Sequence, residues 1–179
     1  MSQEFISYFH SLTEINQKEF VLAPHIIGVI LGAEDGELDQ VESKTLDTVY
    51  TTQIGMVDDS MPLIMKNLKA YELYDSINEE AAKLGAIGTP EFWKKKVEIF
   101  IQLLGRVNAT IGGLPPESLK KYKQFTLEIM FKVASASGGG LLGNGQKIND
   151  FELNWMKIVC QNTSITVEDI LVFLQRKNF

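Results

Sequence analysis

The densest group of chemically capable side chains is a run of carboxylates between residues 34 and 42. A hard cation such as Ca²⁺ or Mg²⁺ binds where several oxygen ligands converge from one turn. The segment from Asp35 to Glu42 reproduces the latter part of an EF-hand loop, but Leu31 and Ala33 stand where its first oxygen ligands belong. A complete EF-hand loop is therefore excluded. The carboxylates of this acidic turn are Glu34, Asp35, Glu37, Asp39 and Glu42.

Helix capping is the competing role for two of these acids. Asp39 and Glu42 have the spacing of a capping box, in which each side chain accepts a hydrogen bond from the other residue's free backbone N–H. This spacing favours a helix that begins at Asp39. Two other roles stay open. One is a partial Ca²⁺ or Mg²⁺ site formed by Asp35, Asp39 and Glu42, and the other is a docking patch for a basic partner formed by Glu34, Asp35, Glu37 and Asp39.

A glycine-rich segment at residues 138–146 contains a formal nucleotide-binding pattern. Gly138, Gly140 and Gly143 match G-x-G-x-x-G. That pattern binds a dinucleotide when a strand precedes it and a helix begins at its third glycine. Here a helical apolar stripe leads into the segment and the next capping residue is Asn149, so we expect a loop between helices. A small nucleotide-binding protein or enzyme that uses this loop is the alternative.

Nucleophilic catalysis and zinc binding find little support. The histidines are His10 and His25, and the single cysteine is Cys160. His25 lies in an apolar helical segment, where a hydrogen-bonded core histidine is the usual explanation. Cys160 has the surroundings of a buried hydrophobic residue rather than of a stabilised thiolate. We therefore expect a protein that is not an enzyme, with no catalytic residue and no cofactor beyond the divalent cation already considered.

Two lysine runs, residues 94–96 and 120–123, provide local positive charge beside Trp93 and Tyr122. Such runs can contact anionic lipid headgroups or an acidic partner, although they are more often solvated helix faces. A peripheral membrane adaptor is therefore a further alternative. The three lysines of the first run are expected to lie largely outside the apolar stripe of their helix. The stripe consists of Phe92, Val97, Phe100, Ile101 and Leu104.

Composition indicates one globular domain that covers residues 1–179. Hydrophobic residues make up 45% of the chain and charged residues 22%, close to globular averages. The net charge of −6 argues against nucleic acid as a partner. The single cysteine excludes an internal disulfide and agrees with a cytoplasmic location. The first residues lack the pattern of a secretory signal, and the apolar stretch 20–33 is shorter than the roughly 20 residues of a membrane span.

Helix signals recur along the sequence, whereas hairpin patterns do not. Thr89 before Pro90 combines a capping residue with a first-position proline, and Thr166 precedes another apolar helical segment. The first long helix is expected over 16–33, bent by Pro24. We therefore expect an all-α bundle of about seven to nine helices. The expected helices begin near residues 16, 39, 61, 75, 89, 115, 149 and 166.

The two halves of the chain also share a weak repeat. In residues 29–49 and 133–159, an apolar helix ends in small residues and glycine, and a turn with a cap and a glutamate leads into a second helix. A duplicated helical hairpin, which is an approximate internal two-fold repeat, follows from this pattern. The paired positions are Gly36 with Gly138, Leu38 with Ile148, Asp39 with Asn149, and Glu42 with Glu152.

This pattern resembles the tellurite-resistance TerB-like family. The second copy departs from it, because Ser137 stands where the family often has Asp. The resemblance implies two symmetry-related hairpins in a compact bundle, a link to tellurite and general stress resistance, and an accessory role without established catalysis. The family's domain also appears in co-chaperones near the inner membrane. The first copy matches through Ala33, Asp35, Gly36, Leu38, Asp39 and Glu42, and the second through Ala136, Gly138, Ile148, Asn149 and Glu152.

The leading hypothesis is a non-catalytic interaction or scaffold module of a stress-response system. It would dock a protein partner or a divalent cation through the acidic turn. Its expected location is the cytoplasm, with the inner face of the membrane as a further possibility. The sequence leaves the oligomeric state open.

Overall fold

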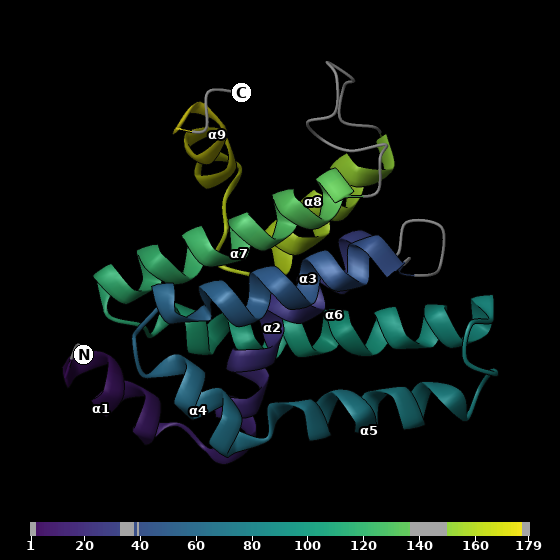
Figure 1. The fold of residues 1–179 in the computed structure, drawn as a ribbon, viewed down its shortest axis with the longest axis horizontal. Coiled ribbons are helices and arrows are strands. Elements are labelled where there is room, and N and C mark those ends of the chain that lie inside the picture. The colour runs from purple at the N-terminus through teal and green to yellow at the C-terminus, as the bar shows by residue number, and fades with distance from the viewer. Residues whose placement is uncertain (1–2, 33–37, 39, 137–149, 177–179) are drawn as a thin grey trace.

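The computed structural model describes residues 3–32, 38, 40–136 and 150–176, with the side chains of 150–153 and 156 excepted. These residues form nine α-helices and one 3-10 turn, and no strand occurs among them, so the expected all-α bundle is confirmed (Figure 1). The elements are α1 (Gln3–Ser11), α2 (Glu14–Gly32), α3 (Gln40–Gln53), η1 (Ile54–Met56), α4 (Met61–Leu68), α5 (Ala70–Ala82), α6 (Pro90–Gly112), α7 (Pro116–Ala136), α8 (Asp150–Asn162) and α9 (Val167–Arg176).

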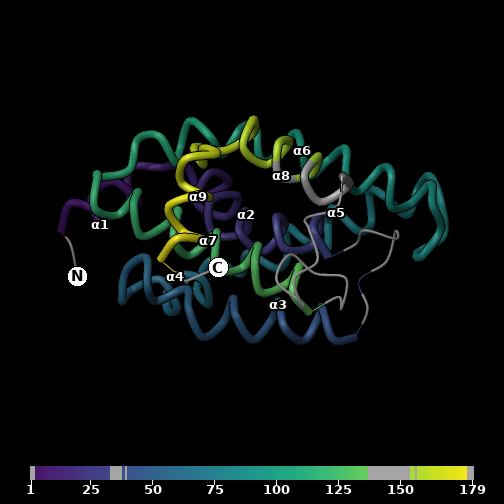
Figure 2. Tube along the Cα trace, turned by 90° about the horizontal axis from the view of Figure 1, so that it is seen from above, coloured from purple at the N-terminus to yellow at the C-terminus, as the bar shows by residue number. Residues whose placement is uncertain are grey.

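Helix α2 is the central element of the bundle. Every residue of α2 from Glu19 to Gly32 is buried. Helices α3, α5, α6 and α7 pack around it, and Figure 2 shows α2 between α6 and α3. A helix that is apolar on all sides has to be enclosed in this way, because no face of it is stable in water. The apolar stretch that begins at Phe20 therefore forms the core of the domain.

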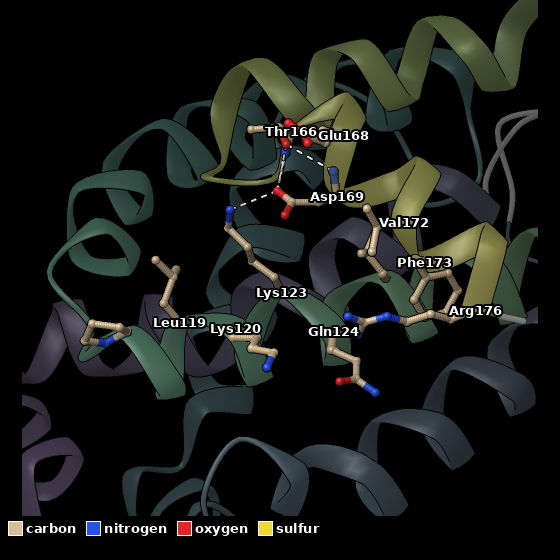
Figure 3. Close-up of a pocket in the computed structure, with 12 residues that line it drawn as sticks. Leu119, Lys120, Lys123, Gln124, Thr166, Glu168, Asp169, Val172, Phe173 and Arg176 are labelled. Carbon is tan, nitrogen blue, oxygen red and sulfur yellow. Dashed lines mark hydrogen bonds and ion pairs between the residues drawn. The ribbon is translucent and has the colours of Figure 1, made fainter.

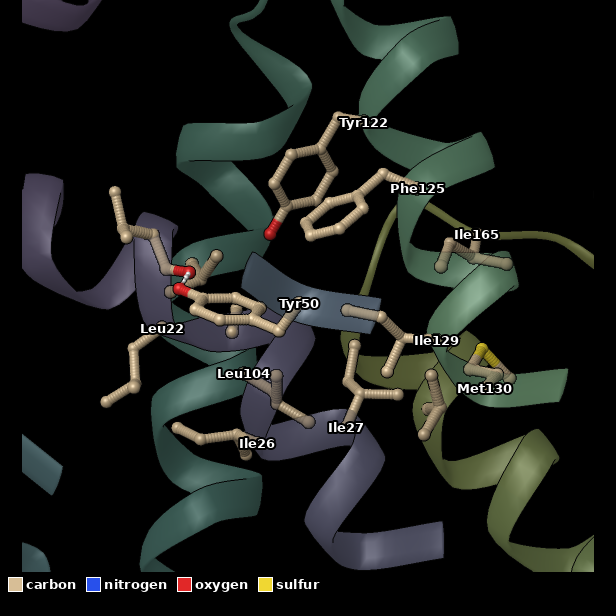
Figure 4. Close-up of a cluster of buried hydrophobic side chains, with 14 of the residues drawn as sticks. Leu22, Ile26, Ile27, Tyr50, Leu104, Tyr122, Phe125, Ile129, Met130 and Ile165 are labelled. Atoms are coloured by element: carbon tan, nitrogen blue, oxygen red, sulfur yellow. Dashed lines mark hydrogen bonds between the residues drawn. The ribbon is translucent and has the colours of Figure 1, made fainter. Parts of the chain in front are cut away.

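Pro24 lies inside α2 and removes one backbone hydrogen bond. Proline has no N–H, so the carbonyl of Phe20, four residues earlier, loses its usual partner. The Tyr122 hydroxyl of α7 donates to that carbonyl at 3.2 Å. One residue further, the Tyr50 hydroxyl of α3 donates to the Val21 carbonyl at 2.6 Å, within the buried cluster of Figure 4. Tyr122 thus donates where the proline cannot, and Tyr50 adds a second bond in the same turn.

Two glycines allow α2 to approach its neighbours closely. A Cβ atom at Gly28 would lie 2.4 Å from Leu46 Cδ1 and 2.9 Å from Ile129 Cγ2. A Cβ atom at Gly32 would lie 2.6 Å from Leu38 Cδ2 and 2.9 Å from Val133 Cγ1. Both positions face α7, so the contact between α2 and α7 depends on the absence of side chains there.

The helix ends follow the sequence signals in part. Thr89 caps α6 by accepting from Phe92 N–H at 3.3 Å, as expected. Thr166 caps α9, and Asp169 completes the box by accepting from Thr166 N–H at 2.8 Å. The expected division between residues 73 and 75 is wrong, because the chain breaks at Lys69, whose φ of 49° is left-handed.

Helix α1 was not expected from the sequence. Its Phe5 and Phe9 are buried in the core, and its Tyr8 hydroxyl donates to the Thr110 carbonyl of α6 at 2.5 Å. Within the part of the chain that the structure describes, no helix is both long and apolar enough to cross a bilayer.

The surroundings of Gly28 and Gly105 predict opposite effects of a glycine-to-alanine substitution on the free energy of unfolding. Gly28→Ala should lower the free energy of unfolding by about 1–3 kcal/mol, because the added methyl group overlaps Leu46 and Ile129 in a packed core. Gly105→Ala in the middle of α6 should raise it by up to about 1 kcal/mol, because alanine favours a helix and the nearest atom lies 3.6 Å away. Urea unfolding measures both, and a stabilised Gly28→Ala variant would contradict the close packing of α2.

Candidate functional site

Most of the acidic turn lies outside the described residues. Glu34, Asp35, Glu37 and Asp39 are in this group, and so is the glycine-rich segment 138–146. Glu42 is described, and it is buried in α3 with 4% of its surface exposed. Among the described residues no group of three or more His, Cys, Asp or Glu side chains could hold a metal ion. The metal and docking roles of the acidic turn therefore stay predictions.

The remaining candidates divide between surface and interior. His10 is exposed, and Cys160 is half-buried rather than buried as expected. Burial, and secondarily the charge of Asp169, raises the pKa of the Cys160 thiol, which disfavours the nucleophilic thiolate. Lys94 is exposed as expected, but Lys96 is 5% exposed, so the expectation that it lies off the apolar face is wrong.

A groove between α7 and α9 combines an apolar surface with charged side chains from both helices. Its volume is about 410 Å³, within the usual range for binding sites. Its apolar lining consists of Pro116, Leu119 and Leu127 of α7 and Val172 and Phe173 of α9. Figure 3 labels Leu119, Val172 and Phe173. The polar residues of this α7–α9 groove are Lys120, Lys123, Gln124, Thr166, Glu168, Asp169 and Arg176.

One ion pair holds the two walls of the groove together. Lys123 Nζ donates to Asp169 Oδ2 at 2.8 Å, as drawn in Figure 3. Burial raises the pKa of Asp169, but hydrogen bonds from Lys123 and Thr166 outweigh it and the net pKa is lowered. Below these groups Phe173 stacks on Phe131 with ring centroids 5.0 Å apart. The ion pair and the stacked rings fix α9 on α7.

Two cations of the groove remain available to a ligand. Lys120 and Arg176 have no ion pair or side-chain hydrogen bond with any residue that the structure describes. In Figure 3 the Lys120 chain comes from α7 and the Arg176 chain from α9. The groove therefore presents positive charge from both walls beside its apolar surface.

A second polar cluster lies between α2, α5 and α6, with Lys96 and His25 buried and Tyr74, Asn78 and Trp93 half-buried. Lys96 Nζ donates to the Tyr74 hydroxyl at 2.9 Å. The same ammonium lies 4.6 Å from the ring centre of Tyr74, 4.7 Å from Trp93 and 5.6 Å from Phe92 and Phe100. Such ring faces attract a cation, but burial still lowers the pKa of Lys96 to about 8. We call Lys96, His25, Tyr74, Asn78 and Trp93 the Lys96 cluster.

His25 is the α2 member of this cluster. It is 7% exposed, and its ring contacts Tyr50 of α3 and Tyr71 and Tyr74 of α5 edge to face. Its Nδ1 has no hydrogen-bond partner among the described residues. The expected burial of His25 is therefore confirmed, but the expected hydrogen bond is not found at Nδ1. Burial, and then the positive charge of Lys96, lowers the pKa of His25 to about 4.

The burial of Lys96 has a signal in the sequence. Lys96 lies four residues after Phe92 and four before Phe100, and this spacing places all three on one face of a helix. The α7–α9 groove had no comparable signal, because its walls are formed by segments 46 residues apart at the Lys123–Asp169 pair.

Comparisons of the chain with family models, curated proteins and solved structures found no match. The resemblance to the TerB-like family therefore stays a prediction from the sequence, and the site is interpreted from its own geometry.

The environment of His25 predicts an acid-sensitive stability. The unfolded chain binds a proton at His25 near pH 6.5, whereas the folded protein resists it until about pH 4. The contribution of His25 to the free energy of unfolding is therefore fully present above about pH 6.5. It falls by about 3 kcal/mol as the pH drops to 4. His25→Phe should remove this part of the pH dependence in urea unfolding, whereas His10→Phe on the exposed face of α1 should keep it. An unchanged slope in His25→Phe would contradict the burial of a neutral imidazole.

Proposed function

We propose that the chain is a non-catalytic interaction module that holds an acidic amphipathic helix of a partner protein in the α7–α9 groove. The observation that carries this proposal is the pairing of an apolar floor with two unpaired cations, Lys120 and Arg176, on opposite walls. An amphipathic helix that lies in a hydrophobic groove is a common mode of recognition between proteins.

The shape of the groove favours a helical segment over a compact ligand. Its α7 wall runs from Pro116 to Leu127, which is about 16 Å along a helix axis. The α7 residues recur at helical spacing, so side chains three and four positions apart on a partner helix can insert between them. Helix α9 packs mainly on α7, and its outer side exposes Val167 and Leu171 at 61% and 54%.

Charge decides the character of the partner. Lys120 and Arg176 attract carboxylates. The charge of Asp169 is compensated by Lys123, so Glu168 is the acidic residue of the groove that would repel an anion. Acidic side chains at the rim of the partner helix would speed association and fix its orientation. The wider assignment to a stress-response system in the cytoplasm or at the inner face of the membrane is part of this proposal and rests on the sequence pattern alone.

A selection experiment tests the proposed partner chemistry. A displayed library of helical peptides, randomised along one face and its two flanks, is selected against the purified chain. We expect enriched peptides with leucine or isoleucine at positions i, i+4 and i+7 and with Asp or Glu beside them. Binding of a selected peptide, measured by fluorescence polarisation, should weaken at least about tenfold in the Lys120→Glu/Arg176→Glu variant, because two attractive contacts become repulsive.

Matched variants separate this proposal from its alternatives. The double variant Lys94→Glu/Lys95→Glu on α6 changes the net charge by the same amount and should leave the affinity unchanged. Enrichment of basic peptides, or equal binding by the groove variant and the α6 variant, would contradict the proposal. Co-sedimentation of the wild-type chain with anionic vesicles, lost in the groove variant while peptide selection fails, would favour the membrane adaptor instead.

A further inference from the structure

Lys96 is a buried cation that forms no ion pair within the described part of the chain. It is 5% exposed, and no carboxylate of the described residues forms a salt bridge with it. Its ammonium has three N–H donors, of which the Tyr74 hydroxyl accepts one. The surrounding ring faces offset part of the cost of burial, but they accept no strong hydrogen bond. An isolated ion in such a place costs several kcal/mol unless an opposite charge joins it.

Three buried polar atoms on other residues of the cluster have no hydrogen-bond partner in the part of the chain that the structure describes. They are His25 Nδ1 on α2, Asn78 Oδ1 on α5 and Trp93 Nε1 on α6. Asn78 follows Tyr74 by one helical turn, and Trp93 precedes Lys96 by one turn, so both lie on the faces that enclose the ammonium. Buried polar groups are normally hydrogen-bonded, and three exceptions beside one unpaired cation are unusual.

We propose that the Lys96 cluster is a binding site for one small monovalent anion of the size of chloride, held by the Lys96 ammonium and the Trp93 indole N–H. This site is separate from the α7–α9 groove and does not depend on the function proposed for it.

The charges and rings of the cluster determine the size and the charge of the anion that it would bind. Lys96 supplies one positive charge, and His25 is neutral near pH 7 because its pKa is about 4. A monovalent anion neutralises the cluster, whereas a divalent anion such as sulfate would leave a buried excess of negative charge. The centres of the Tyr74, Trp93, Phe92 and Phe100 rings lie within 5.6 Å of the ammonium, so the proposed anion has to be compact.

Thermal unfolding in two salts tests the proposal. Sodium chloride is compared with sodium gluconate at equal ionic strength and pH 7, because gluconate is monovalent but too large for the cluster. We expect chloride to raise Tm more than gluconate does. Above the dissociation constant, each tenfold increase in chloride should raise the folded-to-unfolded ratio about tenfold relative to gluconate. Identical curves in the two salts would overturn the proposal.

Variants assign the effect to the cluster. Lys96→Met should abolish the difference between the salts, whereas Lys94→Met, an equal change of charge on the same helix, should retain it. Trp93→Phe keeps a ring but removes the N–H donor, so it should need several-fold more chloride for the same effect. A chloride effect that persists in Lys96→Met would exclude this site.

A measurement on the wild-type chain covers the case in which Lys96→Met fails to fold. With ¹³C-labelled lysine, NMR titration follows the pKa of Lys96, which burial lowers to about 8. A bound anion stabilises the charged ammonium, so chloride should raise this pKa by about one unit or more relative to gluconate. An equal pKa in both salts would contradict anion binding at Lys96.

Discussion

The packing of the bundle depends on the hydrogen bonds that the backbone of α2 receives where Pro24 interrupts the helix. A helix buried on all sides has no water to complete its hydrogen bonds, and an unpaired buried carbonyl costs about 1–3 kcal/mol. The Tyr122 and Tyr50 hydroxyls supply donors to the carbonyls of Phe20 and Val21. These bonds also fix the depth at which α3 and α7 pack on α2, together with the close contacts at Gly28 and Gly32.

The position of α2 determines both candidate sites. Because α7 packs one face on α2, its opposite face, with Leu119, Lys120 and Lys123, is left for α9 and for the groove. Because α5 and α6 cover His25 of α2, Lys96 is enclosed beside Tyr74 rather than in water. The groove therefore exposes the charges of Lys120 and Arg176, and the Lys96 ammonium is buried without an ion pair to any described residue.

The sequence predicted the helical class and several helix ends because those depend on local chemistry. Thr89 and Thr166 cap helices by bonds within three residues, and continuous apolar residues from Phe20 indicate a buried helix. The break at Lys69 was not predictable from spacing, because a left-handed lysine has no strong local signal. The pairing of Lys123 with Asp169 and of Tyr122 with Phe20 joins distant segments. Such contacts follow from tertiary packing, which no local pattern encodes.

A double-mutant cycle between Pro24 and Tyr122 tests the central claim about α2 most directly. In the wild-type background, Tyr122→Phe leaves the Phe20 carbonyl unpaired and should cost about 1–3 kcal/mol in urea unfolding. In a Pro24→Ala background the new N–H of residue 24 can bond to that carbonyl, so the same change should cost at least about 1 kcal/mol less. Equal losses in the two backgrounds would show that the tyrosine hydroxyl does not replace the hydrogen bond that the proline removes.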